Sequence, residues 1–258
     1  MEVIEQKQIS RRFTRALATY DHHAEAQQQI CQRLTQLLQL YGTISYQRAL
    51  EIGCGSGGFT RMLMKQVHVD RWVINDLCSS CQSFLPEQTA TGHASPLFLA
   101  GDAEQILFPG PFDLIASASA FQWMKEQKSF LQKLFALLQP KGMLLFNSFT
   151  PDNLKEIRHI TGKGLNYPEP ERLRSWIEEA GFLLLHEEQE TITLTFDSPL
   201  EVLRHLKYTG VTATADGSVW TRQKQAAFCE QYRQLYGNRD QQVSLTYSPI
   251  YWVAVKNR

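Results

Sequence analysis

The sequence predicts an α/β fold built on a doubly wound, mostly parallel sheet of seven strands. Short, nearly continuous apolar runs alternate with segments of helical periodicity, which is typical of parallel strands covered by helices on both faces. The length of 258 residues suits one large domain. Its 43% apolar and 20% charged residues are typical of a globular protein with a packed core.

Two helices are expected before the first strand. The second has an apolar face at helical spacing, and Gly42 is placed to end it. The residues of that face are Ile30, Leu34, Leu37, Leu38 and Tyr41. Upstream, Phe13, Leu17 and Tyr20 are also helically spaced, which indicates the first helix.

The strands follow as short apolar runs that are separated by helical segments. The seven expected strands are 48–52, 72–76, 96–102, 112–119, 142–149, 182–196 and 244–256. Helices are expected over 57–66 and 127–139, with a short one after residue 76 and another that ends at Gly181.

A helical insertion is expected between the last two strands. Ser198 and Glu201 have the spacing of a capping box, and Pro199 suits the first helical position. From there to about residue 239 the pattern is largely helical. We therefore expect one domain over 1–258, with a Rossmann-like core over 45–197 and 241–258, an N-terminal helical lid over 1–44 and a second helical lid over 198–240.

Charge and cysteine usage limit the classes of partner. Lys+Arg and Asp+Glu are both 26, which argues against wholesale nucleic-acid binding. The first residues lack the apolar core of a signal peptide, and no apolar run is long enough to span a membrane. Five scattered cysteines are typical of reduced thiols in the cytoplasm.

Cys78 and Cys81 form a C-x-x-C pair, which is half of a zinc site or a redox pair. No second pair lies at suitable spacing, so we expect two incidental thiols and no metal.

The stretch "ALEIGCGSGGFT" (49–60) places four glycines directly after a strand. Gly53, Gly55 and Gly58 match the G-x-G-x-x-G pattern of dinucleotide enzymes. Glu51 with Gly53, Gly55 and Gly57 matches E-x-G-x-G-x-G, a pattern of S-adenosylmethionine (SAM) enzymes. Either pattern predicts a ligand at the start of the next helix, because glycines allow close approach and the first helical N–H groups face outward.

Two further strand ends offer polar groups to the same ligand, since ligands of such sheets bind beyond the carboxyl ends of the strands. Asp76, followed by Leu77, lies about 20 residues after the glycine loop and suits the two ribose hydroxyls of either cofactor. Asp102 could accept a hydrogen bond from an adenine amine, and the N–H of Ala103 could reach a ring nitrogen.

The segment "FDLIASASAFQWM" (112–124) ends another strand with small serines and then aromatic residues. Ser117 leaves room for a ligand, and Phe121 and Trp123 could wall it or belong to the core.

Taken in order, "LEIGCGSGGFT", "INDLC", "GDAEQ", "FDLIASASAFQW" and "LQPKGMLLFNSF" resemble the class I SAM-dependent methyltransferases. The resemblance covers about residues 45–150 and implies their Rossmann-like fold, with SAM as cofactor and S-adenosylhomocysteine as its product. In that setting Glu51 would hold the amino-acid end of SAM, whereas it would repel the pyrophosphate of a dinucleotide. Gly53, Gly55 and Gly57 become the working triplet, and Gly58 becomes the helix start.

A narrower resemblance covers nearly the whole chain. "FTRALATYDHHAEAQ" and "SPLEVLRHLKYTGVTAT" resemble the malonyl-acyl-carrier-protein O-methyltransferases of biotin synthesis, although Thr212 stands where an Asn is usual. This resemblance implies methyl transfer to the free carboxylate of malonyl on carrier protein or coenzyme A. The family pattern places Tyr20 on the N-terminal lid. As candidates we take Tyr20, Gln27 and Trp123 for catalysis and His23, Phe121, Arg204 and Lys207 for substrate binding.

Three alternatives stay open on the sequence. A related methyltransferase could act on another carboxylate, a quinone or an amine. An NAD-dependent oxidoreductase would use the same glycine loop but lacks support from Asp102 and the 112–124 segment. A non-catalytic module would bind SAM without turnover.

Overall fold

The computed structural model describes residues 20, 23–86, 95–210 and 221–257. Its contacts divide the chain into two compact units. The core unit comprises Gln27–Ser148, Pro168–Gln189 and Ile250–Arg258. The accessory unit comprises Met1–Ala26, Phe149–Tyr167 and Glu190–Pro249. The predicted helix through Phe13 and Leu17, and Thr212, lie outside the described residues.

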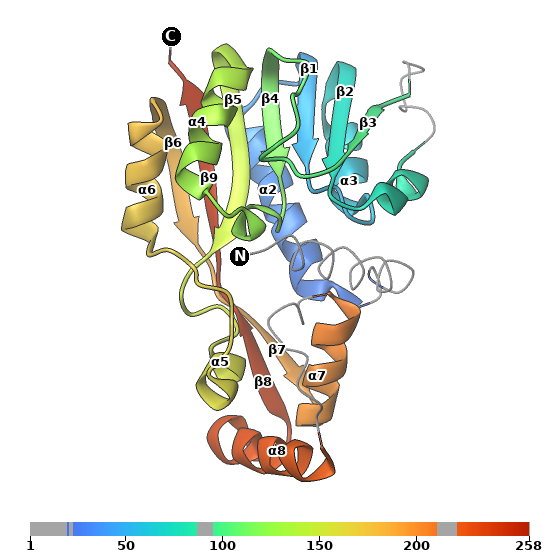
Figure 1. Ribbon diagram of the computed structural model, residues 1–258, viewed down its shortest axis with the longest axis vertical. Coiled ribbons are helices and arrows are strands. Elements are labelled where there is room, and N and C mark those ends of the chain that lie inside the picture. The colour runs from blue at the N-terminus through green and yellow to red at the C-terminus, as the bar shows by residue number, and fades with distance from the viewer. Residues whose placement is uncertain (1–19, 21–22, 87–94, 211–220, 258) are drawn as a thin grey trace. The chain divides into compact units, whose positions relative to one another are not determined.

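The core unit holds a seven-stranded sheet in the order β3-β2-β1-β4-β5-β9-β6 (Figure 1). Its strands are β1 (Ser45–Ile52), β2 (His68–Asp76), β3 (Leu97–Ala100), β4 (Phe112–Ser117), β5 (Leu138–Phe149), β6 (Phe182–Gln189) and β9 (Pro249–Lys256). The pairs β1–β2, β1–β4, β2–β3 and β4–β5 are parallel, and β6 is antiparallel to β9. The predicted doubly wound, mostly parallel sheet of seven strands is therefore confirmed.

Helices cover both faces of this sheet because each presents an apolar stripe to it. In Figure 1, α2 (Glu25–Tyr41) and α3 (Gly58–Gln66) lie behind the sheet, and α4 (Gln127–Leu137) and α6 (Pro170–Glu179) lie in front. Phe130 of α4 and Ile177 of α6 join Phe146 and Trp252 of the strands in one hydrophobic cluster. On the other face, the predicted residues Ile30, Leu34, Leu37 and Leu38 of α2 are buried, whereas Tyr41 at the end of the helix is exposed, so its predicted place on the buried face is wrong.

The described part of the accessory unit contains a two-stranded antiparallel sheet of β7 (Ile192–Phe196) and β8 (Val243–Tyr247) and three helices that follow residue 150. These are α5 (Lys155–Thr161), α7 (Pro199–Tyr208) and α8 (Arg222–Tyr236). Ser198 caps α7 by accepting a hydrogen bond from the Glu201 N–H, as its capping-box spacing predicts.

Buried polar contacts tie these helices to β8. The Glu156 carboxylate of α5 accepts hydrogen bonds from the Thr246 N–H at 3.1 Å and the Thr246 hydroxyl at 2.6 Å. The Nε2 atom of His205 on α7 lies 2.8 Å from the Tyr247 hydroxyl. Burial lowers the pKa of His205 to about 4, so the ring is neutral in this contact.

Two predicted strands are wrong in extent. The runs 182–196 and 244–256 are each broken in two, and their halves pair in different sheets: β6 with β9, and β7 with β8. The break in the second run is fixed by residues far away in sequence. Ser248 accepts from the Thr150 N–H at 2.9 Å and the Thr150 hydroxyl at 2.7 Å, and its own N–H donates to Asn153 at 3.1 Å.

The structure groups β7 and β8 with the accessory helices rather than with the core sheet. The functional division into a core and two lids, over 1–44 and 198–240, stays a prediction. Among the described helices, none combines the length and the hydropathy of a membrane span.

Candidate cofactor and active site

The glycine loop joins β1 to α3 at the carboxyl end of the first strand. Gly53, Gly55 and Gly57 have φ angles of 75°, 56° and 74°, in the left-handed region that favours glycine. A Cβ atom on Gly53 would lie 2.3 Å from the Cβ of Ala120. Gly58 begins α3, has no positive φ and has room for a side chain. Within this loop, the glycines with positive φ angles are therefore those of the E-x-G-x-G-x-G pattern.

Glu51 is a buried carboxylate just ahead of this loop, with 1% of its surface exposed. Within the described residues, neither of its oxygens has a partner in good hydrogen-bond geometry. Burial raises the pKa of Glu51 from 4.5 to about 7, and the nearby Thr60 hydroxyl, which interacts with the carboxylate, offsets part of this shift. A buried acid with so little support from donors fits a cationic group such as the ammonium of SAM.

Asp76 ends β2 and fixes the position of the glycine loop. One carboxylate oxygen accepts from the Gly55 N–H at 2.9 Å, and the other accepts from the Cys78 N–H at 2.8 Å. Burial raises the pKa of Asp76, and these two N–H donors offset part of that effect. Leu77, which follows it, is half-buried.

Asp102 and Ala103 follow β3. Asp102 accepts from the Glu104 N–H at 2.9 Å, which closes a local turn, and Ala103 is buried. The Lys133 ammonium donates to the carbonyl of Ala103 at 2.8 Å and so holds this turn against α4. The turn stands at the same edge of the sheet as Asp76, because β2 and β3 are parallel.

The segment after β4 is partly structural. The Ser117 hydroxyl donates to the Ile52 carbonyl at 2.9 Å and joins β4 to β1. Phe121 is buried, with its ring centroid 4.5 Å from that of Phe146. Trp123, at the end of η2 (Phe121–Trp123), is half-buried. Ligand contacts of Ser117, Phe121 and Trp123 stay predictions.

The predicted substrate residues differ in their settings. In the accessory unit, Tyr20 is half-buried and the His23 ring stacks on Tyr208 with centroids 4.5 Å apart. Arg204 and Lys207 are both exposed on α7, as their i, i+3 spacing on one face allows. In the core unit, Gln27 is buried, and its amide oxygen accepts no hydrogen bond from the part of the chain that the structure describes.

Sequence reasoning missed two features. The Asn75 side chain donates to the carbonyls of Leu99 and Gly101, and the main-chain carbonyl of Asn75 accepts from the Gly53 N–H, so this residue braces two loops of the site. The second feature is a group of thiols beside Asp76. The Cys81 and Cys54 thiols interact, and this interaction raises the pKa of Cys81. The "INDLC" motif contained the first feature. The C-x-x-C spacing showed the pair Cys78 and Cys81, but it gave no sign that Asp76 and Cys54 lie close to these thiols.

Comparison with known proteins gives the family. A family model described as "Methyltransferase domain" matches residues 20–187. A malonyl-[acyl-carrier protein] O-methyltransferase of Porphyromonas gingivalis is 45% identical over 253 residues, covering 97% of this chain and 96% of that protein. One of the same name from Haemophilus ducreyi is 41% identical over 252 residues, covering 96% of each.

Solved structures agree on the fold. The N-methyltransferase NodS of Bradyrhizobium japonicum, in complex with S-adenosylhomocysteine, aligns with a TM-score of 0.57 at 16% identity, covering 97% of this chain and 100% of that one. The chain belongs to the SAM-dependent methyltransferases, in the same family as the malonyl-[acyl-carrier protein] O-methyltransferases.

Proposed function

We propose that the chain transfers a methyl group from SAM to the free carboxylate of a malonyl group carried as a thioester on an acyl carrier protein. The methyl ester would prime synthesis of the pimeloyl part of biotin. The observation that carries this proposal is the 45% identity to the Porphyromonas gingivalis enzyme. That similarity spans 97% of this chain and so extends beyond the cofactor-binding core.

The chemistry asks little of the protein beyond positioning. A malonyl carboxylate is ionised at neutral pH, so no strong general base is needed. Bound SAM supplies an electrophilic methyl group on a sulfonium. The chain's residues have to hold the carboxylate oxygen in line with that methyl group and exclude water. Such positioning can contribute on the order of 7–11 kcal/mol.

For the cofactor, we assign Glu51 to the ammonium group, because it is a buried carboxylate whose oxygens have no partner in good hydrogen-bond geometry within the described residues. The positive-φ glycines let the backbone approach the amino-acid end closely. Asp76 suits the ribose hydroxyls, and we assign Leu77, which follows it, and Ser117 at the end of β4 to the cofactor as well. Asp102 and Ala103 suit the adenine amine and ring nitrogen.

For the substrate, we assign Tyr20, Gln27 and Trp123 to the malonyl carboxylate and assign His23 and Phe121 to substrate binding. Tyr20 and Gln27 carry neutral donors that can orient an anion without competing with its charge. Gln27 in particular is a buried amide whose oxygen has no donor in the described ranges. Replacing Tyr20 by Phe tests this assignment, because it removes only the hydroxyl.

The accessory unit offers basic residues to the carrier, which is acidic. Five exposed cations lie on α7 and α8: Arg204, Lys207, Arg222, Lys224 and Arg233. We assign these two helices to transient docking of the carrier protein by charge complementarity. Malonyl-coenzyme A would use the same cations through its phosphates. None of the five cysteines, all within the described ranges, forms a disulfide, which supports a cytoplasmic location.

The test is a methyl-transfer reaction with purified protein and methyl-labelled SAM. Malonyl carrier protein is the substrate, and acetyl carrier protein, which has no free carboxylate, is the matched control. We expect label on the malonyl form alone. Label on neither form would overturn the substrate assignment and leave the methyltransferase family membership intact.

A further inference from the structure

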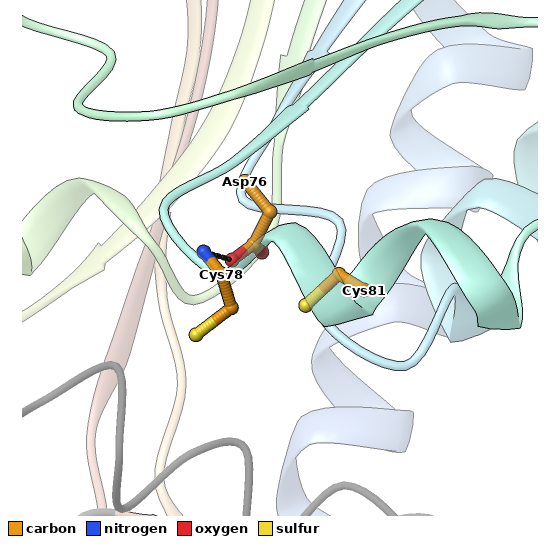
Figure 2. Close-up of side chains that lie close together, drawn as sticks. All are labelled: Asp76, Cys78 and Cys81. Atoms are coloured by element: carbon orange, nitrogen blue, oxygen red, sulfur yellow. Dashed lines mark hydrogen bonds between the residues drawn. The ribbon is translucent and has the colours of Figure 1, made fainter.

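We propose that Asp76, Cys78 and Cys81 form a binding site for a thiophilic divalent cation, Zn²⁺ above all, which excludes the cofactor. One carboxylate oxygen and the two Sγ atoms all lie within 4.8 Å of one another, and the three residues are buried. Figure 2 shows the Asp76 carboxylate at the end of β2 and the two thiols at the start of η1 (Ser79–Phe84).

The donor set consists of two sulfurs and one carboxylate oxygen. Zn²⁺ accepts three protein ligands with water in the fourth position of a tetrahedron. Because the third ligand is a carboxylate and not a cysteine, a search for two C-x-x-C pairs overlooks this set.

The role of Asp76 in cofactor binding explains the carboxylate but not the thiols. Ribose hydroxyls need an acceptor, and the two backbone N–H donors of Gly55 and Cys78 already orient this one. Among the described residues, Asp76 forms no ion pair with Lys, Arg or His. A divalent cation would supply the charge that this buried carboxylate lacks, and soft thiolate ligands select Zn²⁺ over Mg²⁺ or Ca²⁺.

This inference rests on the proposed role of Asp76 in holding the ribose. One carboxylate cannot serve a tetrahedral cation and both ribose hydroxyls in the same geometry. The metal-free chain is therefore the form that binds SAM, and the metal-bound chain is inhibited. Zinc inhibition should be competitive with SAM and should be reversed by a chelator.

The first experiment uses Co²⁺ as a spectroscopic substitute for Zn²⁺, added to the metal-free full-length protein. We expect thiolate-to-Co²⁺ charge-transfer absorption that saturates at one equivalent and is removed by Zn²⁺. The double variant Cys78→Ser/Cys81→Ser should bind at least about tenfold more weakly, whereas Cys229→Ser, which removes a buried thiol of α8, should bind like the wild type. No such absorption in the wild type, or equal absorption in the double variant, would overturn the site.

The second experiment separates the metal site from the cofactor role. Saturating SAM should raise the apparent Kd of the wild type for Co²⁺. As a control, the melting temperature and the SAM affinity of the double variant show whether that variant is folded. Asp76→Asn keeps all the thiols and should weaken the binding of both ligands. Metal binding that SAM leaves unchanged would overturn the mutual exclusion. Methyl transfer measured in excess chelator tests the proposed function independently of either result.

Discussion

At the scale of single residues, Glu51 decides how cofactor binding depends on pH. Its pKa is raised to about 7 by burial, and the ammonium of SAM requires the ionised carboxylate. Lowering the pH from about 7 to about 5.5 should therefore weaken SAM binding by up to about tenfold per pH unit. Calorimetric titration of the wild type and of Glu51→Gln measures this.

The variant is the internal control for that titration. Glu51→Gln should bind SAM about 10- to 100-fold more weakly than the wild type does at neutral pH, and its affinity should depend little on pH in the same range. Wild-type affinity that stays constant over this range would contradict the assignment of Glu51 to the ammonium.

Glu51 also makes the stability of the ligand-free fold depend on pH. Because the folded-state pKa lies above the ordinary value of 4.5, the folded chain binds this proton more tightly than the unfolded chain. The free energy of unfolding should therefore fall as the pH rises from about 4.5 to about 7. The difference in the free energy of unfolding between Glu51→Gln and the wild type should change in favour of the variant by on the order of 2–3 kcal/mol between about pH 4.5 and pH 8. Urea unfolding of both proteins at the two pH values checks this, and a difference that does not change with pH would refute it.

At the scale of elements, the turn from β1 to α3 offers a matched pair of glycines. Gly57 has a φ of 74°, and a Cβ there would lie 2.9 Å from the carbonyl oxygen of Phe84. Gly57→Ala should therefore lower the free energy of unfolding by about 2 kcal/mol and weaken SAM binding. Gly58→Ala, one residue later, should leave stability unchanged or raise it by up to ~1 kcal/mol, because Gly58 already has helical geometry. If chemical denaturation shows that Gly57→Ala and Gly58→Ala lose the same amount of stability, the E-x-G-x-G-x-G assignment is wrong.

Elements were predictable from sequence where the determinants are local. The alternation of apolar runs with helical stripes predicted the sheet, and Ser198 with Pro199 and Glu201 predicted the start of α7. The breaks near residues 190 and 248 were not predictable, because Thr150, which lies 98 residues before Ser248, fixes the second one. For the same reason periodicity could not show that β7 and β8 leave the core sheet.

The candidate site divides in the same way. Glu51 and the glycine triplet stand in one short pattern, and Asp76 follows at a typical spacing along the chain. The structure buries both carboxylates and gives the three glycines positive φ angles. The contact of Cys54 with Cys81 joins a loop to a 3₁₀ helix across 27 residues, so only the folded chain reveals it.

At the scale of the whole molecule, the exposed cations of α7 should govern recognition of the carrier. Arg204→Glu/Lys207→Glu should raise the KM for malonyl carrier protein several-fold with little change in kcat, because rim charges act mainly on association. The double variant Lys65→Glu/Arg71→Glu makes the same change in net charge on exposed residues of the core unit and should have little effect. Steady-state kinetics at low ionic strength measure both, and equal KM values for the two double variants would argue against docking on α7.

The central claim is that the methyl group ends on the free carboxylate of malonyl, and the identity of the product tests it most directly. After incubation with SAM, the intact mass of malonyl carrier protein should increase by one methylene unit, and mild alkaline hydrolysis of the ester should release methanol. Acetyl carrier protein should keep its mass. A methylated product that resists ester hydrolysis, or equal methylation of the acetyl form, would contradict carboxyl methylation.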